Sequence, residues 1–452
     1  MTTFHIEQFG CRATQADAAA IERQFLERGY APSAQTAQAD VVVINTCTVT
    51  ASADSQARQA IRRFHAQNPQ ARIIVTGCYA QRSPEELAQI AGVSWVVGNS
   101  HKLEIAALCS AGLQPGISEF VSLDAGPAKI LTGNIFEQTE ILVAPVFGGE
   151  GDHTRPILKI QDGCNNRCSY CVIPFVRGKS RSLAPAQVVA EIEKLTAAGY
   201  QEIVLSGINL GSYGRDLAPR VELLDLIRRI LEETPLPRLR LSSIEPQDVT
   251  QDLVDLFACE NRIARHFHIP LQSASDRILA AMHRWYRAAH YARKMELIRE
   301  RIPAAAIGAD VIAGFSGEAD ADHRATMDFI ARLPFSYLHV FSFSKRPGTA
   351  AEKLSGEVPP HVIKQRSREL RALGEEKRAA FRASQIGKML RVLTLREQSE
   401  DSSGPWTAAL SDNYLQLRVP GHHPRNRFLE VCLAADGGEL VGEILEEAKN
   451  RN

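Results

Sequence analysis

The sequence predicts an α/β protein with three parts: an N-terminal doubly wound parallel sheet, a central partial (β/α) barrel and a small C-terminal all-β barrel. Short apolar runs alternate with helical patterns from residue 1 to about 114, and again from 156 to about 349. Such alternation is typical of parallel strands joined by helices. After residue 385 the pattern changes to closely spaced alternating runs separated by Gly, Ser, Pro and Asp, which is typical of a small β barrel.

The N-terminal domain, residues 1–114, has a cysteine after each of its first three predicted strands: Cys11, Cys47 and Cys78. The carboxyl ends of parallel strands lie at one edge of a sheet, where such folds bind ligands. We therefore expect the three thiols to converge on one metal site; the alternative is three small buried hydrophobic side chains. The expected strands are 3–9, 40–45, 72–76 and 94–97, and the expected helices are 15–28, 52–67, 83–91 and 102–111.

Residues 115–155 form a predicted linker with one or two edge strands, because Gly, Pro and acidic residues interrupt any periodicity there. The central domain, residues 156–384, has six strand–helix units, which suit a partial barrel better than a flat sheet. Barrel active sites lie at the C-terminal strand ends. The domain closes with a charged helix over 361–384, interpreted as solvated, with a nucleic-acid contact as the alternative. The expected strands are 157–161, 202–206, 238–242, 266–269, 307–312 and 337–343.

A loop with three cysteines follows the first strand of this barrel. Cys164, Cys168 and Cys171 have the spacing C-x3-C-x2-C, which lets all three sulfurs face one centre. Cysteine thiolates hold iron–sulfur clusters, and three ligands on a four-iron cluster leave one iron open for a substrate or cofactor. A zinc site is the alternative, but structural zinc sites have four ligands. No fourth Cys or His occurs in the ten residues after Cys171.

The C-terminal domain, residues 385–452, combines aromatic residues with several arginines and histidines. Small β barrels of this composition often bind oligonucleotides. The alternative is that Trp406, Tyr414 and Phe428 belong to the core and that the charges are ordinary surface charges.

The composition limits which partners, cell compartment and cysteine chemistry we expect for this protein. Lys+Arg and Asp+Glu are both 52, so the net charge is zero and argues neither for nor against nucleic acid. The N-terminus has no signal-peptide core and the chain has no run of 18 apolar residues, so we expect a cytoplasmic protein without a membrane partner. The nine cysteines are then reduced, which favours metal binding over disulfides. Cys109, Cys259 and Cys432 lack a motif and are interpreted as structural.

Together these motifs resemble the methylthiotransferase family of radical S-adenosylmethionine (SAM) enzymes. The resemblance covers essentially the whole chain, including a C-terminal domain similar to the RNA-binding TRAM module. Within the family the residues after Cys47 and Cys164 look most like the branch acting on N6-threonylcarbamoyladenosine of tRNA. The branches acting on isopentenyladenosine or on a ribosomal-protein aspartate are the alternatives, and a non-catalytic zinc-containing RNA-binding protein is the rival from another class. The resemblance rests on Gly10-Cys11 and on the blocks 45–50, 76–81, 163–171 and 173–178.

The resemblance implies two 4Fe–4S clusters: Cys164, Cys168 and Cys171 hold the SAM-cleaving cluster, and the three N-terminal cysteines hold an auxiliary cluster. Two SAM molecules are used per turnover, one to methylate a sulfur of the auxiliary cluster and one to yield the radical that removes hydrogen from C2 of adenine. The implied partners are the tRNA anticodon loop, modified at position 37, and a low-potential electron donor of the flavodoxin or ferredoxin type. No catalytic side chain is implied beyond the cluster ligands. The implied SAM contacts are Gly207, Asn209, Ser243, Glu245, Gln272, Asp310 and Arg346.

The chain departs from the family pattern at Thr14, Ala274 and Ser316, where Asn, Gly and Pro are usual. None of them is an implied cluster ligand, although Thr14 lies close enough to Cys11 to alter its hydrogen bonding. A threonylcarbamoyl group carries a carboxylate, so its pocket is expected to offer a cation or backbone N–H groups. Arg177, Lys179 and Arg181, just past the cluster loop, are the predicted candidates, with a structural role or a phosphate contact as the alternative for each.

Overall fold

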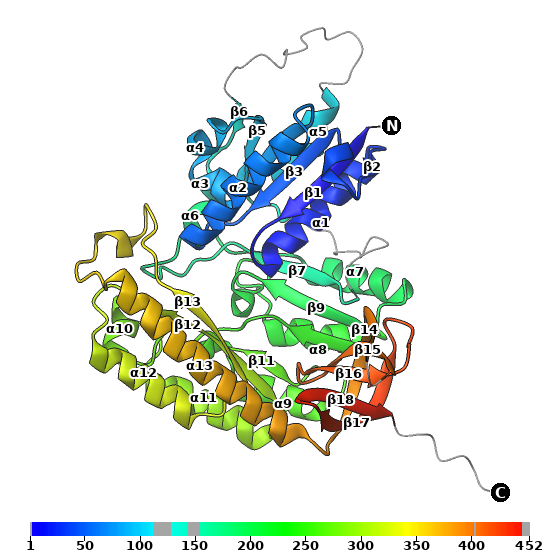
Figure 1. Ribbon diagram of the computed structural model, residues 1–452, viewed down its shortest axis with the longest axis vertical. Coiled ribbons are helices and arrows are strands. Elements are labelled where there is room, and N and C mark those ends of the chain that lie inside the picture. The colour runs from blue at the N-terminus through cyan, green and yellow to red at the C-terminus, as the bar shows by residue number, and fades with distance from the viewer. Residues whose placement is uncertain (1, 112–127, 143–153, 402–403, 445–452) are drawn as a thin grey trace, which may run out of the picture.

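The computed structural model describes residues 2–111, 128–142, 154–401 and 404–444. The predicted linker is therefore described only at 128–142 and 154–155. The N-terminal sheet lies above a central barrel, and the small C-terminal barrel packs beside the lower end of the central one (Figure 1). Among the helices in the described ranges, none is long and apolar enough to span a membrane.

Six parallel strands form the N-terminal sheet, in the order β2-β1-β3-β4-β5-β6. The four predicted strands are present. The edge strand β6 is one of those expected in the linker, whereas β2 escapes sequence analysis because two residues are too few to show alternation. The strands are β1 Thr3–Gln8, β2 Ala31–Pro32, β3 Val41–Thr46, β4 Arg72–Gly77, β5 Val93–Gly98 and β6 Lys129–Leu131.

The sequence of β3 explains why helices cover both faces of this sheet. All six of its residues are buried. Val42 and Ile44 pack with α2 on one face, whereas Val41 and Val43 pack with α1 and α5 on the other. A strand buried on both faces is typical of a doubly wound parallel sheet. The helices are α1 Arg12–Glu27, α2 Ala51–Gln67 and α5 Ile105–Ala111.

The six strands predicted for the central domain form a parallel partial barrel. Two sheets, β10-β9-β7-β8 and β11-β12-β13, are joined by parallel bridges between Leu239 and Ile263 and between Ser243 and His268. The short strand β8, Arg181–Ser182, pairs antiparallel with β7 and was not predicted. The parallel strands are β7 Ile157–Asp162, β9 Glu202–Gly207, β10 Arg238–Leu241, β11 His266–His268, β12 Ala306–Ala313 and β13 Tyr337–Ser342.

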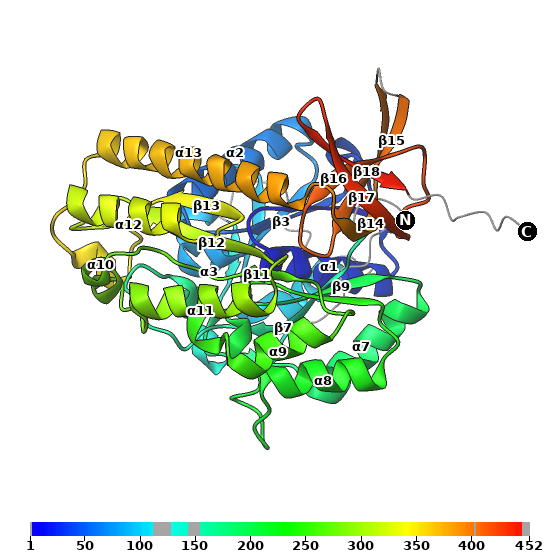
Figure 2. The ribbon, with the colours of Figure 1, turned by 90° about the horizontal axis from the view of Figure 1, so that it is seen from below.

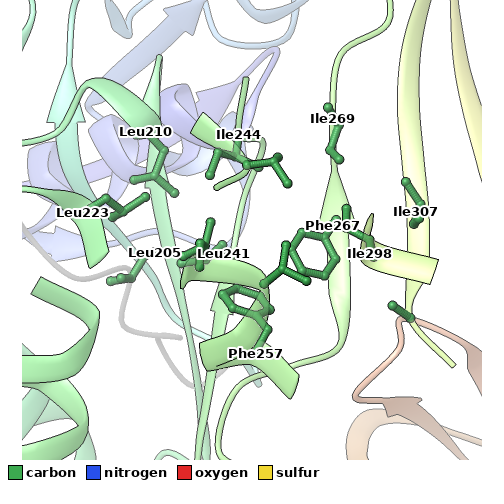
Figure 3. Packing of buried hydrophobic residues seen from close by; sticks show 14 of the residues in the cluster. Leu205, Leu210, Leu223, Leu241, Ile244, Phe257, Phe267, Ile269, Ile298 and Ile307 are labelled. Carbon is green, nitrogen blue, oxygen red and sulfur yellow. The ribbon is translucent and has the colours of Figure 1, made fainter. Parts of the chain in front are cut away.

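Helices cover the outer face of this barrel (Figure 2). In α8 the buried residues Leu223, Leu226, Ile227 and Ile230 follow helical spacing and form one apolar stripe. Figure 3 shows side chains of the strands meeting those of the helices. The ring centroids of Phe257, on α9, and Phe267, on β11, lie 4.7 Å apart. The helices are α7 Pro185–Ala197, α8 Leu223–Glu233, α9 Gln251–Cys259, α10 Asp276–Ala281, α11 Ala288–Arg301, α12 Asp320–Arg332 and α13 Pro360–Gln385.

Helix α13 is only partly the solvated helix that its charged sequence predicts. One face is buried against β13, and at Gly374 an added Cβ would lie 3.3 Å from the Cβ of Leu338. The last domain is a closed barrel in the order β14-β15-β16-β18-β17, and β15 was not predicted. The strands are β14 Met389–Asp401, β15 Gly404–Ser411, β16 Gln416–Pro420, β17 Phe428–Asp436 and β18 Glu439–Ile444.

A buried ion-pair group holds the C-terminal barrel against the central one. Glu202 is fully buried and pairs with Arg238 and with Arg240, at 2.5 and 2.7 Å. The two guanidinium groups also donate to backbone oxygens of the C-terminal barrel, including those of Leu410 and Ser411 at 3.2 and 2.9 Å. Burial opposes the ionisation of Glu202, but Arg238, Arg240 and the neighbouring Arg155 outweigh it and hold its pKa below the ordinary value.

Replacing Glu202 by Leu is expected to lower the free energy of unfolding by roughly 3–5 kcal/mol, because two guanidinium groups stay buried without their carboxylate. Calorimetric unfolding tests this. The exposed pair Arg229–Glu233 supplies a control, since Glu233→Gln should cost below about 1 kcal/mol. Because the pKa of Glu202 is depressed, its contribution is present above about pH 4.3 and is lost as the pH falls through the folded-state pKa. Equal losses in the two variants would contradict this role of Glu202.

Candidate active site

The three-cysteine loop follows β7 at the mouth of the barrel, as predicted. It is anchored by a hydrogen bond from the Ser169 amide to the Met282 carbonyl, at 3.0 Å. Gly163 begins the loop with φ +73°, and a Cβ there would lie 2.0 Å from the carbonyl oxygen of Lys179, so only glycine fits. Burial and the neighbouring Cys168 raise the pKa of Cys171 to about 12. A bound metal reverses this preference, because its positive charge favours thiolates.

Polar side chains from the strand ends surround a cavity of about 200 Å³ beside this loop. Two features show that the cavity is built for a polar ligand. Asn209 is 8% exposed, and its Oδ1 has no partner among the described residues. Gln272 has φ +61°, a left-handed conformation that is strained for a non-glycine residue. Of the predicted SAM contacts, this lining includes Asn209, Ser243, Glu245, Gln272 and Asp310.

Two predicted SAM contacts do not line this cavity. Gly207 instead faces Gln161, where an added Cβ would lie 2.9 Å from the side-chain Oε1. That Oε1 accepts a hydrogen bond from the Asn209 amide at 2.8 Å, so Gly207 acts on the cavity wall indirectly. Arg346 reaches the N-terminal domain and donates to the hydroxyl of Thr48 at 2.7 Å. Arg346 therefore lies outside this cavity, and its contact with SAM stays a prediction.

Arg284 belongs to the cavity wall, although sequence analysis missed it. Its guanidinium pairs with Glu245 and lies 3.4 Å from Sγ of Cys168. Burial opposes its charge, but nearby groups that include Tyr170 and Glu245 hold the pKa of Arg284 well above its ordinary value. Arg284 follows helix α10 in a segment that carries no recognisable motif, so no local signal marks it.

The three N-terminal cysteines converge at the carboxyl edge of their sheet. Cys11 caps α1, Cys47 follows β3, and Cys78 begins helix α3, Cys78–Arg82. At Gly10 an added Cβ would lie 2.5 Å from the Cβ of Cys47, so the first two strand ends are in contact. Burial, Cys78 and Cys11 raise the pKa of Cys47 to about 12. Three close thiols from three strand ends can hold a metal centre.

Thr14, a departure from the family pattern, supports this site. Its hydroxyl donates to the Cys11 carbonyl at 2.6 Å, and its own carbonyl accepts from the side chain of Asn45 at 2.8 Å. Thr14 therefore ties the turn that carries Cys11 to the end of β3. The other cysteines lie outside both sets: Cys109 on α5, Cys259 on α9 and Cys432 on β17.

The short helix α6, Ile173–Arg177, lies between the two cysteine sets. Its Val176 packs against Cys78, while the helix begins two residues after Cys171. Asn99 donates to the Val176 carbonyl at 2.7 Å and lies 3.6 Å from Sγ of Cys78. The two sites are therefore joined by a short stretch of backbone.

A buried network of charges surrounds the end of α6. Arg177 donates to Asp162 and to Asp17, each at 2.9 Å, and Lys159 bridges the same two carboxylates. Lys102 pairs with Asp17 at 2.6 Å. Burial opposes the ionisation of Asp17, but Arg177, Lys102 and Lys159 outweigh it and hold its pKa well below the ordinary value. The network crosses the boundary between the two domains.

This network corrects the prediction of a carboxylate-binding cation. Arg177 is 2% exposed, with both terminal nitrogens bound to carboxylates. Arg181 is 8% exposed and donates to the carbonyl oxygens of Arg177 and Lys179. Neither can reach a substrate carboxylate, so only Lys179, which is exposed, stays available from that set.

A further group of ion pairs, centred on Asp54, fixes the loop of Cys47. Arg346 and Arg82 both pair with Asp54, the latter at 2.9 Å. The hydroxyl of Thr48, beside Cys47, donates to Asp54 at 2.7 Å. All of these side chains are buried or nearly so, and a guanidinium from the central domain thus holds the ligand loop of the N-terminal one.

Replacing Asn209 by Ala is expected to weaken SAM binding about tenfold, because the loss of one buried hydrogen bond costs about 1–1.5 kcal/mol. Arg346→Gln should leave SAM affinity within about twofold, since this side chain is outside the cavity. Calorimetric titration of the cluster-loaded protein with SAM measures both. A larger loss in the Arg346 variant would restore it as a SAM contact.

Comparison with known proteins identifies the family. Residues 3–98 match the model described as Uncharacterized protein family UPF0004, and residues 158–330 match the Radical SAM superfamily. The fold is similar to that of TsrM from Kitasatospora setae, a radical S-adenosylmethionine methyltransferase, with a TM-score of 0.53, 15% identity and coverage of 75% of this chain and 73% of that one. At this identity the similarity shows the fold alone.

Curated relatives match nearly the whole chain. Threonylcarbamoyladenosine tRNA methylthiotransferase MtaB of Aquifex aeolicus is 37% identical over 94% of this chain and 99% of its own. MtaB of Bacillus subtilis is 35% identical over 93% and 91%. The tRNA-2-methylthio-N(6)-dimethylallyladenosine synthase of Syntrophobacter fumaroxidans is 33% identical over 98% and 96%. The chain therefore belongs to the radical SAM tRNA methylthiotransferase family, whose members are enzymes that use SAM and a 4Fe–4S cluster.

Proposed function

We propose that the enzyme transfers a methylthio group to C2 of N6-threonylcarbamoyladenosine at position 37 of tRNA, and that it uses two 4Fe–4S clusters. The observation that carries this proposal is the pair of three-cysteine sites joined through α6. One site opens on the polar cavity assigned to SAM, and the other lies at the adjoining sheet edge. The names of the MtaB relatives, at 33–37% identity, favour the threonylcarbamoyl substrate.

Cys164, Cys168 and Cys171 would hold the cluster that cleaves SAM, and Cys11, Cys47 and Cys78 would hold the auxiliary cluster. When bound, these groups supply the radical that removes hydrogen from C2 and the methylthio group that replaces it. The chain's own residues bind and orient the reactants, and no acid or base among them is needed at the unactivated C2–H bond. A low-potential flavodoxin or ferredoxin is the proposed electron donor.

Buried cations beside both sites assist anionic clusters. Arg284 lies 3.4 Å from Sγ of Cys168, and Arg177 lies within electrostatic range of Cys78 and Cys11. Burial opposes the charge of Arg177, but Asp162, Asp17 and these thiols hold its pKa well above the ordinary value. Each cation thus stays protonated and stabilises the negative charge of neighbouring thiolates.

The route for RNA is a groove of about 500 Å³ between the C-terminal barrel, α13 and β13. The guanidinium of Arg418 stacks 4.5 Å from the ring of Trp406 on its wall. Aromatic rings stack unpaired bases and arginines pair with phosphates, which suits a single-stranded anticodon loop. His339 lines the groove and lies 3.3 Å from Asp310 of the SAM cavity, so a base turned out of the loop has a short path to the reaction site.

The two cysteine sets are expected to separate in function. Ala at Cys164 should abolish the formation of 5′-deoxyadenosine, because SAM loses its open iron. Ala at Cys47 should leave SAM cleavage largely intact but stop methylthio transfer. Chromatography of the nucleoside product and mass spectrometry of tRNA measure the two steps. Cys259→Ala, on the exposed part of α9, is the control and should match wild type. Methylthio transfer at the wild-type rate by the Cys47 variant would contradict the auxiliary site.

Substrate choice is tested with anticodon stem–loops that carry threonylcarbamoyl, isopentenyl or unmodified adenosine at position 37. The threonylcarbamoyl RNA should be converted with the highest kcat/KM, because its carboxylate adds charge-assisted contacts that the others lack. Liquid chromatography with mass spectrometry quantifies the 2-methylthio nucleosides. Preferential conversion of the isopentenyl RNA would overturn the substrate assignment and leave the chemistry standing.

A further inference from the structure

The proposed substrate needs a cation for its threonyl carboxylate, and the predicted arginines Arg177 and Arg181 do not supply one. Its threonyl carboxylate enters a partly desolvated site, where an unpaired charge is costly. Arg177 and Arg181 are already bound within the protein. The cation must also lie close to the auxiliary site, because C2 of the same base has to reach that site.

Arg12 meets both requirements. It follows Cys11 directly and is the first residue of α1. Its guanidinium is partly buried and donates to the hydroxyl of Tyr414, in the C-terminal barrel, at 3.3 Å. In the described part of the chain Arg12 forms no ion pair, so its charge has no anionic partner. The side chain of Arg12 therefore starts beside the auxiliary site and reaches Tyr414, a residue that lines the groove proposed for RNA.

The surroundings of Arg12 are rigid and come from all three domains. Tyr414 has φ +68° and stacks on His266 with ring centroids 4.3 Å apart. Helix α1 packs directly on the barrel, where Ala16 and Ala19 contact Ile157 of β7. Tyr414 also lines the groove proposed for RNA. The ring of Tyr414 can contact a planar base, and the unpaired guanidinium of Arg12 can bind an anionic substituent on that base.

Two carboxylates of the adjoining barrel already have partners. Asp310 accepts from His268 at 3.0 Å and lies 3.3 Å from His339, and Glu202 pairs with Arg240. The threonylcarbamoyl group extends from N6 of the same base whose C2 reacts. The guanidinium of Arg12, attached one residue after Cys11, is therefore a candidate partner for its carboxylate.

We propose that Arg12 binds the carboxylate of the threonylcarbamoyl group and thereby selects this substrate. The inference rests on the proposed function and names the residue that gives it specificity. Arg12 is a specificity residue, distinct from Arg418, whose place on the groove suits sequence-independent contact with the RNA backbone.

The test compares two stem–loops on the cluster-loaded enzyme with SAM: one with the natural threonyl carboxylate and one with the carboxylate converted to an uncharged amide. Wild type should bind the acid at least about tenfold more tightly, as expected for a charge-assisted hydrogen bond. In Arg12→Gln this ratio should fall to about one, and Arg12→Lys should restore part of it. In Arg418→Gln both RNAs should weaken together, with the ratio preserved. Fluorescence anisotropy gives the Kd values, and iron content with EPR checks that the auxiliary site of each variant is loaded.

An acid-to-amide ratio that stays at the wild-type value in Arg12→Gln would overturn the inference, as would its collapse in Lys179→Gln. A wild-type enzyme that binds acid and amide equally would also overturn it, without any change beside Cys11. These outcomes are distinct from failure of the proposed function, in which wild type would methylthiolate the isopentenyl RNA in preference to both.

Discussion

The position of both cysteine sets depends on one buried carboxylate, that of Asp17. It is 1% exposed and pairs with Lys102 from its own domain and with Lys159 and Arg177 from the central one. Breaking a buried ion pair leaves an uncompensated charge and costs roughly 3–5 kcal/mol, so the domains cannot slide past each other cheaply. Because Arg177 ends the helix that joins the two sites, this network fixes the distance between them.

Charges also form the other joints of the molecule. Arg346 holds the loop of Cys47 through Asp54, and Arg240 holds the C-terminal barrel through backbone oxygens. Domain interfaces made of apolar contacts tolerate small shifts of one domain against the other, whereas hydrogen-bonded ion pairs fix both distance and direction. The three domains thereby adjoin one another around the cavity beside Cys164 and the groove proposed for RNA. Arg12, the proposed specificity residue, follows Cys11 and contacts Tyr414 of that groove.

The sequence predicts the strands and both cysteine sets well, because each depends on local pattern. Apolar runs define β3, and cysteines at strand ends follow from the topology of a parallel sheet. Long-range partners carry no such signal. Arg346 pairs with a residue 292 positions away, and Arg177 with one 160 positions away, so their neighbours in the chain give no sign of these partners. Arg284 and Arg12 were missed for the same reason, since each acts through a contact that only the folded chain creates.

We propose that the network around Asp17 holds two clusters at a fixed separation. Pulsed dipolar EPR on the fully loaded and reduced enzyme measures that separation, because the method reports the distance between two paramagnetic centres. We expect two clusters per chain with one narrow distance distribution, which broadens when Asp17 is replaced by Asn. A single cluster per chain, or a broad distribution in the wild-type enzyme, would contradict it.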